Sequence, residues 1–122
     1  MIVLILIFSQ FYACTTSLNK ELIGTWKMAT VYELEENVTQ RHNPANNRFF
    51  TFYENGTFKS GGDPFGENTG KWSLSEEHLL FIDSDAGEDD DSYWRVKIEQ
   101  DTMKWQGAVF EFGKRFRIEH VR

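Results

Sequence analysis

The stretch that decides the fold is "LIGTWKMATVYELE", residues 22–35. From residue 24 onward its side chains alternate between two faces, a period of two that is typical of a β-strand rather than of a helix. One face carries Gly24, Trp26, Met28, Thr30, Tyr32 and Leu34, and the other carries Thr25, Lys27, Ala29, Val31, Glu33 and Glu35. The pattern predicts one long strand whose first face is turned toward a core.

Similar alternation continues through the rest of the 122-residue chain, which has the length of one domain. Asn55-Gly56 is a strong hairpin turn signal, whereas residues 35–47 and 84–92 are polar and predict loops. We expect eight strands and no helix, with the further strands at residues 48–53, 57–60, 69–75, 78–83, 93–99, 102–110 and 114–121. Closure removes the exposed edges of such a meander. The predicted fold class is therefore all-β, an eight-stranded antiparallel up-and-down β-barrel, and such an interior is either filled or holds one small ligand.

The N-terminal segment has the features of a bacterial export signal. Residues 1–8, "MIVLILIF", form an apolar run that is too short to span a bilayer but has the length of a signal-peptide core. Cys14 is the one cysteine, so it has no internal disulfide partner, and "FYAC" (11–14) resembles a lipobox, in which the cysteine is lipidated. We expect a signal peptide at 1–13, a lipidated tether at 14–21 and a barrel domain at 22–122.

This reading predicts a protein of the bacterial cell envelope, held to the membrane by its lipid anchor. Thr15 follows the cysteine where some bacteria use Asp to retain lipoproteins in the inner membrane, which favours the outer membrane. The alternative is an ordinary cleaved signal with an incidental cysteine.

Gly24-Thr25-Trp26 at the start of the first strand resembles the G-x-W signature of lipocalins. "ENGTF" (54–58) and "GKWSL" (70–74) are similar to a lipocalin-like domain of small lipoproteins from Bacteroidetes-type bacteria. The resemblance implies that Trp26 plugs the closed end of the barrel and that an arginine of the last strand packs on it, with Arg115, Arg117 and Arg122 as candidates. The Thr-Asp-Tyr motif and the disulfides of larger lipocalins are absent, so retinoid-like transport is not implied.

Composition argues against several functional classes. The formal charge is −6, and no basic cluster is present, so nucleic-acid binding is not expected. We find no G-x-S-x-G, H-E-x-x-H or P-loop motif, so neither an enzyme nor a cofactor is expected. His42, His78 and His120 lack metal-ligand spacing, and we expect each to be a surface or turn residue.

Two groups of residues are candidates for a site. The first is an acidic run that offers oxygen ligands to calcium; it comprises Asp83, Asp85, Glu88, Asp89, Asp90 and Asp91. Gly87 falls at the wrong position for an EF-hand. The alternative is that the run forms a solvated hairpin tip. The second is a set of large side chains that line a ligand pocket or simply fill the barrel core: Met28, Tyr32, Phe50, Phe52, Phe58, Trp72, Phe81, Trp94, Trp105 and Phe116. If these large side chains line a pocket, we expect the protein to bind a small apolar or amphipathic ligand. If they fill the barrel, we expect a non-enzymatic interaction or structural protein of the cell envelope.

Overall fold

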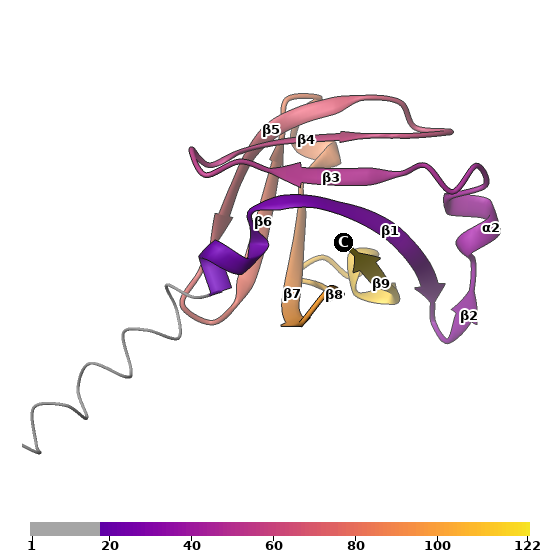
Figure 1. Ribbon diagram of the computed structural model, residues 1–122. Helices are drawn as coiled ribbons and strands as arrows, with labels where there is room; N and C mark the ends of the chain where they lie inside the picture. Colours follow the sequence, from indigo (N-terminus) through magenta and orange to yellow (C-terminus); the bar gives the residue numbers. More distant parts are fainter. Residues whose placement is uncertain (1–17) are drawn as a thin grey trace, which may run out of the picture.

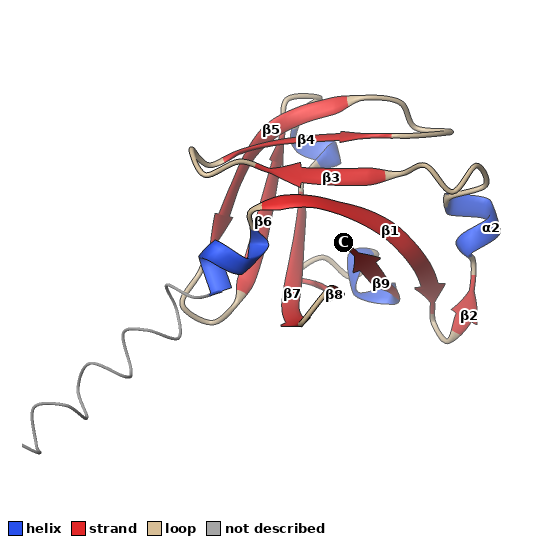
Figure 2. Ribbon diagram, viewed as in Figure 1, coloured by secondary structure: helices blue, strands red, loops and turns tan. Residues whose placement is uncertain are grey.

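Eight antiparallel strands close into a barrel in the computed structural model, which describes residues 18–122 (Figures 1 and 2). They are β1 (Gly24–Glu33), β3 (Phe49–Phe52), β4 (Thr57–Gly61), β5 (Asn68–Leu74), β6 (Leu79–Ser84), β7 (Ser92–Glu99), β8 (Thr102–Ala108) and β9 (Phe116–Val121). Each pairs with the next along the chain, and β1 also pairs with β9 from Lys27↔Val121 to Glu33↔Phe116. The predicted fold class is confirmed, because this last pairing leaves no long open edge.

The prediction of no helix is wrong in detail, because short helical and extended pieces connect the strands. They are β2 (Glu36–Asn37), α2 (Thr39–His42) and two turns of 3-10 helix, η1 (Glu88–Asp90) and η2 (Gly113–Arg115). Residues 18–22 are also helical, and Leu18 and Leu22 are buried, so the end of the predicted tether packs on the barrel. Pieces this short carry no detectable helical periodicity.

The polar segment predicted as a loop at residues 35–47 is held in place by hydrogen bonds to β1. The Thr39 hydroxyl accepts a hydrogen bond from the Val31 amide at 2.9 Å, and the Asn43 side chain donates to the Met28 carbonyl at 2.9 Å. Val38, just before α2, is buried in the core. Tertiary contacts therefore give structure to a segment whose local sequence favours none.

A β-bulge in β1 changes the face on which its later residues lie. Met28 is opposite His120 and Thr30 is opposite Glu119, so Ala29 is an extra residue without a partner in β9. A bulge of this kind shifts the alternation by one position from there on.

The bulge overturns part of the prediction for β1. Val31 is 1% exposed and belongs to the core, whereas Tyr32 turns outward, with the Arg117 guanidinium carbon 4.5 Å from its ring centroid. Leu34, also expected inside, is 61% exposed beyond the end of the strand. The predicted inward placement of Tyr32 and Leu34 was wrong because both faces of this stretch contain apolar residues and the sequence alone does not reveal the bulge.

The two Gly-x-Trp motifs require glycine for different reasons. Gly24 adopts φ +125°, a conformation that L side chains rarely adopt, with open space around it. Gly70 lies between strands, and a Cβ there would be 2.1 Å from the Asp83 carbonyl oxygen and 2.7 Å from the Phe58 ring. Only the first glycine therefore sets the entry of the chain into the barrel.

The last two strands are shorter than predicted. β8 ends at Ala108 because Val109 has φ +69°. Alternation in the predicted strand 102–110 puts Val109 on the same face as Met103 and Trp105, toward the core, but it is 53% exposed, so that expectation is wrong. The segment between them forms η2, and β9 begins at Phe116. Alternation in the predicted strand 114–121 puts Phe116 and Ile118 on one inward face, and both pack in the core. None of the helices within residues 18–122 is long and apolar enough to cross a membrane.

Candidate functional site

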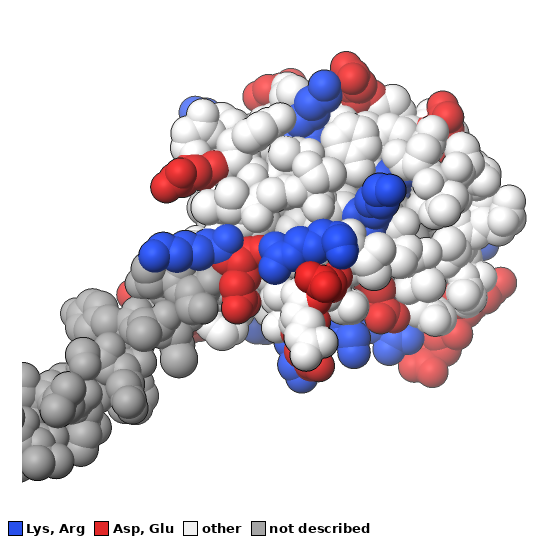
Figure 3. Space-filling model, in the orientation of Figure 1, with Lys and Arg blue, Asp and Glu red and all other residues white. Residues whose placement is uncertain are grey.

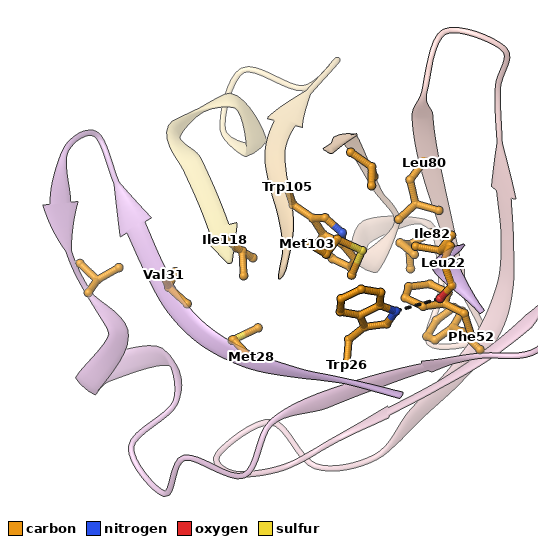
Figure 4. Close-up of a cluster of buried hydrophobic side chains, with 13 residues drawn as sticks. Leu22, Trp26, Met28, Val31, Phe52, Leu80, Ile82, Met103, Trp105 and Ile118 are labelled. Atoms are coloured by element: carbon orange, nitrogen blue, oxygen red, sulfur yellow. Dashed lines mark hydrogen bonds between the residues drawn. The ribbon is translucent and has the colours of Figure 1, made fainter. Parts of the chain in front are cut away.

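One end of the barrel is closed by Trp26. Its side chain is fully buried, and its Nε1 donates a hydrogen bond to the Leu22 carbonyl at 2.8 Å (Figure 4). The Arg122 guanidinium carbon lies 4.2 Å from the centroid of the Trp26 ring. Arg122 also donates to the Glu21 carbonyl at 2.5 Å, which ties the end of the chain to the helical turn before β1.

Of the three arginines that the resemblance suggested, Arg122 is the one that packs on Trp26. Arg115 lies 3.5 Å from the Glu33 carboxylate instead, and Arg117 lies over Tyr32. The cluster around Trp26 includes Phe52, Leu80, Met103 and Trp105, whereas Met28, Val31 and Ile118 lie farther along the barrel (Figure 4).

The opposite end of the barrel contains a cavity of about 820 Å³. Its walls begin at Met28 and at Phe50, the residue of β3 that pairs with Trp26, and extend away from Trp26 to α2, the β4–β5 connection, the acidic loop and η2. Its lining is rich in aromatic and aliphatic side chains, among them Met28, Phe50, Phe58, Ile82, Trp94, Trp105, Phe116 and Ile118. The cavity lies within the size range of small-molecule sites.

The structure divides the predicted pocket residues into three groups. Six of them line the cavity: Met28, Phe50, Phe58, Trp94, Trp105 and Phe116. Phe52 and Trp72 belong to the interior but pack edge to face with each other, 5.8 Å between ring centroids, outside the cavity lining. Tyr32 and Phe81 lie outside the barrel.

Phe81 lies on the outer face of β6. It is opposite Ser73 and Tyr93, and its ring stacks on that of Tyr93 at 4.5 Å, while its neighbours Leu80 and Ile82 are buried in the core. Its expected place in the pocket or core was therefore wrong. Four consecutive apolar residues at 79–82 hide the period of two that would have revealed its face.

Arg48 is a cavity residue that the sequence analysis missed. The residue precedes β3, and the Met28 amide donates to its carbonyl, which continues the pairing with β1. Arg48 is half-buried, donates from Nη1 to the His42 carbonyl at 3.0 Å, and has its guanidinium carbon 4.6 Å from the Phe65 ring centroid. Burial lowers the pKa of Arg48 from its usual value. The alternation Arg48-Phe50-Phe52 was the signal that could have placed it inside.

His120 is buried, contrary to its predicted place at the surface. The inward face of β9 carries Phe116, Ile118 and then His120, which is fully buried with its ring centroid 4.3 Å from that of Trp105. Neither of its nitrogens has a hydrogen-bond partner within the described structure, and the same is true of Trp105 Nε1. Burial, followed by the charge of Arg48, lowers the pKa of His120 to about 3, so the ring is neutral at pH 7.

The other two histidines are separate from this group. His42 in α2 lines the cavity, and its pKa is lowered by burial and then by the charges of Arg48 and Arg41. His78 is exposed in a turn, as predicted. Within residues 18–122, no three His, Cys, Asp or Glu side chains come close enough together to hold a metal ion.

The acidic run organises its own loop. Asp90 accepts hydrogen bonds from the Ser84 hydroxyl at 2.8 Å and from the Asn68 amide at 2.9 Å, and Asp91 accepts from the Ser84 amide at 2.7 Å. Asp85 accepts from the Thr69 hydroxyl at 2.7 Å. These carboxylates point to separate protein donors, an arrangement that does not support the calcium alternative.

Charged side chains are distributed over the surface without segregation. On the face seen in Figure 3, Lys and Arg lie scattered among acidic and neutral side chains. The basic stripe that a nucleic-acid interface needs is not present on this face.

Comparison with known proteins agrees with the closed barrel. Residues 22–105 match the model of the lipocalin-like domain. The chain belongs to this lipocalin-like family. No curated protein matches the sequence. Among solved structures, a duf4847 family protein from Bacteroides vulgatus ATCC 8482 is similar, with a TM-score of 0.58 and 15% identity over 80% of this chain and 91% of that one. At this identity the similarity extends to the fold alone.

Proposed function

We propose that this lipocalin-like protein is a binding protein, which takes one small apolar or amphipathic ligand into the open end of its barrel. The observation that supports the proposal is the cavity of about 820 Å³. The size is usual for a small-molecule site, and the lining combines a large set of apolar and aromatic side chains with Arg48, His42 and a group of acidic residues. The alternative of a wholly filled barrel requires an interior without such a space.

The division of the barrel into two ends also supports binding. Trp26, Leu22 and Met103 are 0% exposed, so the closed end is solid and provides rigidity. The open end leaves Phe65 and Phe112 64% and 69% exposed at the rim of the cavity. Burial of such apolar surface by a ligand is favourable, at about 25 cal/mol per Å².

The unpaired polar atoms near the cavity are compatible with an amphipathic ligand. Buried polar groups normally have partners, yet Trp105 Nε1 and both nitrogens of His120 have none within the described residues. Trp105 lines the cavity, so a ligand or its accompanying water is a natural source of the missing partner.

The experiment is a titration with N-phenyl-1-naphthylamine, an uncharged dye whose fluorescence rises in apolar surroundings. We expect saturable one-to-one binding. Ser60 lines the cavity opposite Phe50, so Ser60→Phe should fill part of the space and weaken binding. Ser73→Phe is the matched control, because Ser73 is exposed on the outer face opposite Phe81. Absence of saturable binding to the wild type, or equal binding by both variants, would refute the proposal.

We further propose that the protein is a lipoprotein of the bacterial cell envelope, anchored through Cys14, with the outer membrane favoured. Cys14 lies outside the described residues, and the proposal rests on the lipobox-like sequence and the apolar run before it. The cysteine should carry lipid, and Cys14→Ser should move the protein from the membrane fraction to the soluble fraction. A Cys14→Ser protein that stays with the membrane would contradict the anchor.

A non-enzymatic role agrees with the interior chemistry. His120 is neutral, and its ring contacts Trp105 and Phe50 rather than a nucleophile or a carboxylate. We therefore propose binding without a chemical step, and turnover of a bound ligand would contradict it.

A further inference from the structure

We propose that the ligand carries a single carboxylate, which Arg48 binds inside the cavity while an apolar tail occupies the aromatic interior. This inference rests on the proposed binding function and names the chemical class of the ligand. The observation behind it is a guanidinium in the cavity wall that takes part in none of the ion pairs among residues 18–122.

Arg48 is half-buried in the cavity wall, and its known contacts leave donors free. It donates from Nη1 to the His42 carbonyl, and the Phe65 ring lies against one face of the guanidinium. A guanidinium has five N–H donors in a planar fork, which matches the two oxygens of a carboxylate. One hydrogen bond to a carbonyl fixes the group in position and leaves most of this fork available.

The positive charge of Arg48 lacks a counter-ion in the part of the chain that the structure describes. The ion pairs among residues 18–122 involve Arg115, Arg122 and three lysines but not Arg48. Removing a charge from water is costly unless an opposite charge accompanies it. Arginines elsewhere on the barrel are exposed and carry no such cost, so the position of Arg48 points to an anion brought by the ligand.

The surroundings of Arg48 favour a ligand with an apolar tail. Arg48 lies just before β3, two residues ahead of the inward-facing Phe50. The Phe50 ring centroid is 5.1 Å from that of Trp105 and 5.7 Å from that of Phe58. A tail that leads inward from Arg48 therefore meets aromatic side chains at once.

The other charged residues that line the cavity favour a ligand with one negative charge over a ligand with two. Glu67 and the acidic residues of the 88–91 loop line the same cavity, and they repel a dianion more strongly than a monoanion. A carboxylate satisfies the fork of Arg48 with the smallest repulsion from this acidic wall, whereas an alkyl phosphate is disfavoured.

The test compares dodecanoate, dodecanol and dodecyl phosphate as competitors of N-phenyl-1-naphthylamine. In the wild type, dodecanoate should compete about 10- to 100-fold more tightly than dodecanol, the range expected for a hydrogen bond to a charged group. Arg48→Met should abolish that difference. The two competitors are compared within the same variant, so a change in dye affinity does not enter the ratio. Arg95→Met is the matched control, because Arg95 is exposed on β7, and it should keep the difference.

The outcomes separate this inference from the proposed function. Dye binding without a preference for dodecanoate overturns the carboxylate site alone, and tighter competition by dodecyl phosphate overturns the choice of a monoanion. Loss of all binding in the wild type overturns the binding function itself. If Arg48→Met does not fold, Arg48→Lys keeps the charge but loses the planar fork, and an unchanged preference in that variant contradicts two-point recognition of the carboxylate.

Discussion

His120 makes the stability of this barrel depend on pH in a way that can be calculated. The ring is fully buried, and its pKa is lowered to about 3, from 6.5 in the unfolded chain. Between these two values the unfolded state takes up a proton that the folded state does not, so the free energy of unfolding falls as the pH falls below 6.5. Above that value the contribution of His120 is fully present.

The size of the effect follows from the number of pH units by which the pH falls below the pKa of His120 in the unfolded chain. Each pH unit below the unfolded pKa costs about 1.4 kcal/mol, so lowering the pH from 7 to about 4.5 should remove roughly 2.5 kcal/mol through His120 alone. His120→Leu should abolish this contribution. It should also leave stability at pH 7 unchanged or raised, because neither ring nitrogen has a partner to lose among the described residues.

The assay is urea unfolding followed by far-ultraviolet circular dichroism at both pH values. Loss of stability between them should be about 2.5 kcal/mol smaller in His120→Leu than in the wild type. His78→Asn removes an exposed histidine at φ 64°, a backbone conformation that Asn also adopts, and serves as the control for loss of a histidine. Equal losses in the wild type and His120→Leu would refute the reasoning, since the carboxylate contributions are common to both proteins.

The remaining predictions concern packing. Trp26→Ala should lower the free energy of unfolding by about 3–5 kcal/mol, as removal of a buried large aromatic does. It should leave saturable dye binding by the folded protein in place, because Trp26 is not among the residues that line the cavity. Loss of dye binding in a folded variant would contradict this separation of plug and cavity. Gly70→Ala should cost about 1–3 kcal/mol, because its Cβ would be 2.1 Å from a backbone oxygen of the next strand, and an unchanged midpoint in urea would count against that close approach.

The fold could be predicted because regular alternation of apolar and polar residues indicates each strand and the face that it turns toward the core. Trp26 and Met28 in β1, and Phe116 and Ile118 in β9, fall on the expected face. The bulge at Ala29 could not be predicted, because Val31 and Tyr32 are both compatible with burial and only the pairing with β9 selects one of them.

The candidate site was harder to predict, because single side chains were placed inside or outside the barrel from their polarity rather than from the alternation along their strand. Strict alternation places Arg48 beside Phe50 and His120 after Ile118 on inward faces, and the structure has both there. His120 was expected at the surface or in a turn, and Arg48 was given no place in the interior, because most charged and imidazole side chains are exposed. At the opposite extreme, the apolar character of Phe81 suggested the interior, although its ring stacks on Tyr93 outside the barrel.

The most direct test of binding in the open end uses the indole N–H signals of the four tryptophans in nuclear magnetic resonance spectra. The described structure places Trp94 and Trp105 on the cavity wall and Trp26 at the closed end. On titration with dodecanoate, the Trp94 and Trp105 signals should shift saturably while that of Trp26 stays in place. Unmoved Trp94 and Trp105 signals at saturating dodecanoate, or a largest shift at Trp26, would contradict a ligand site in this cavity.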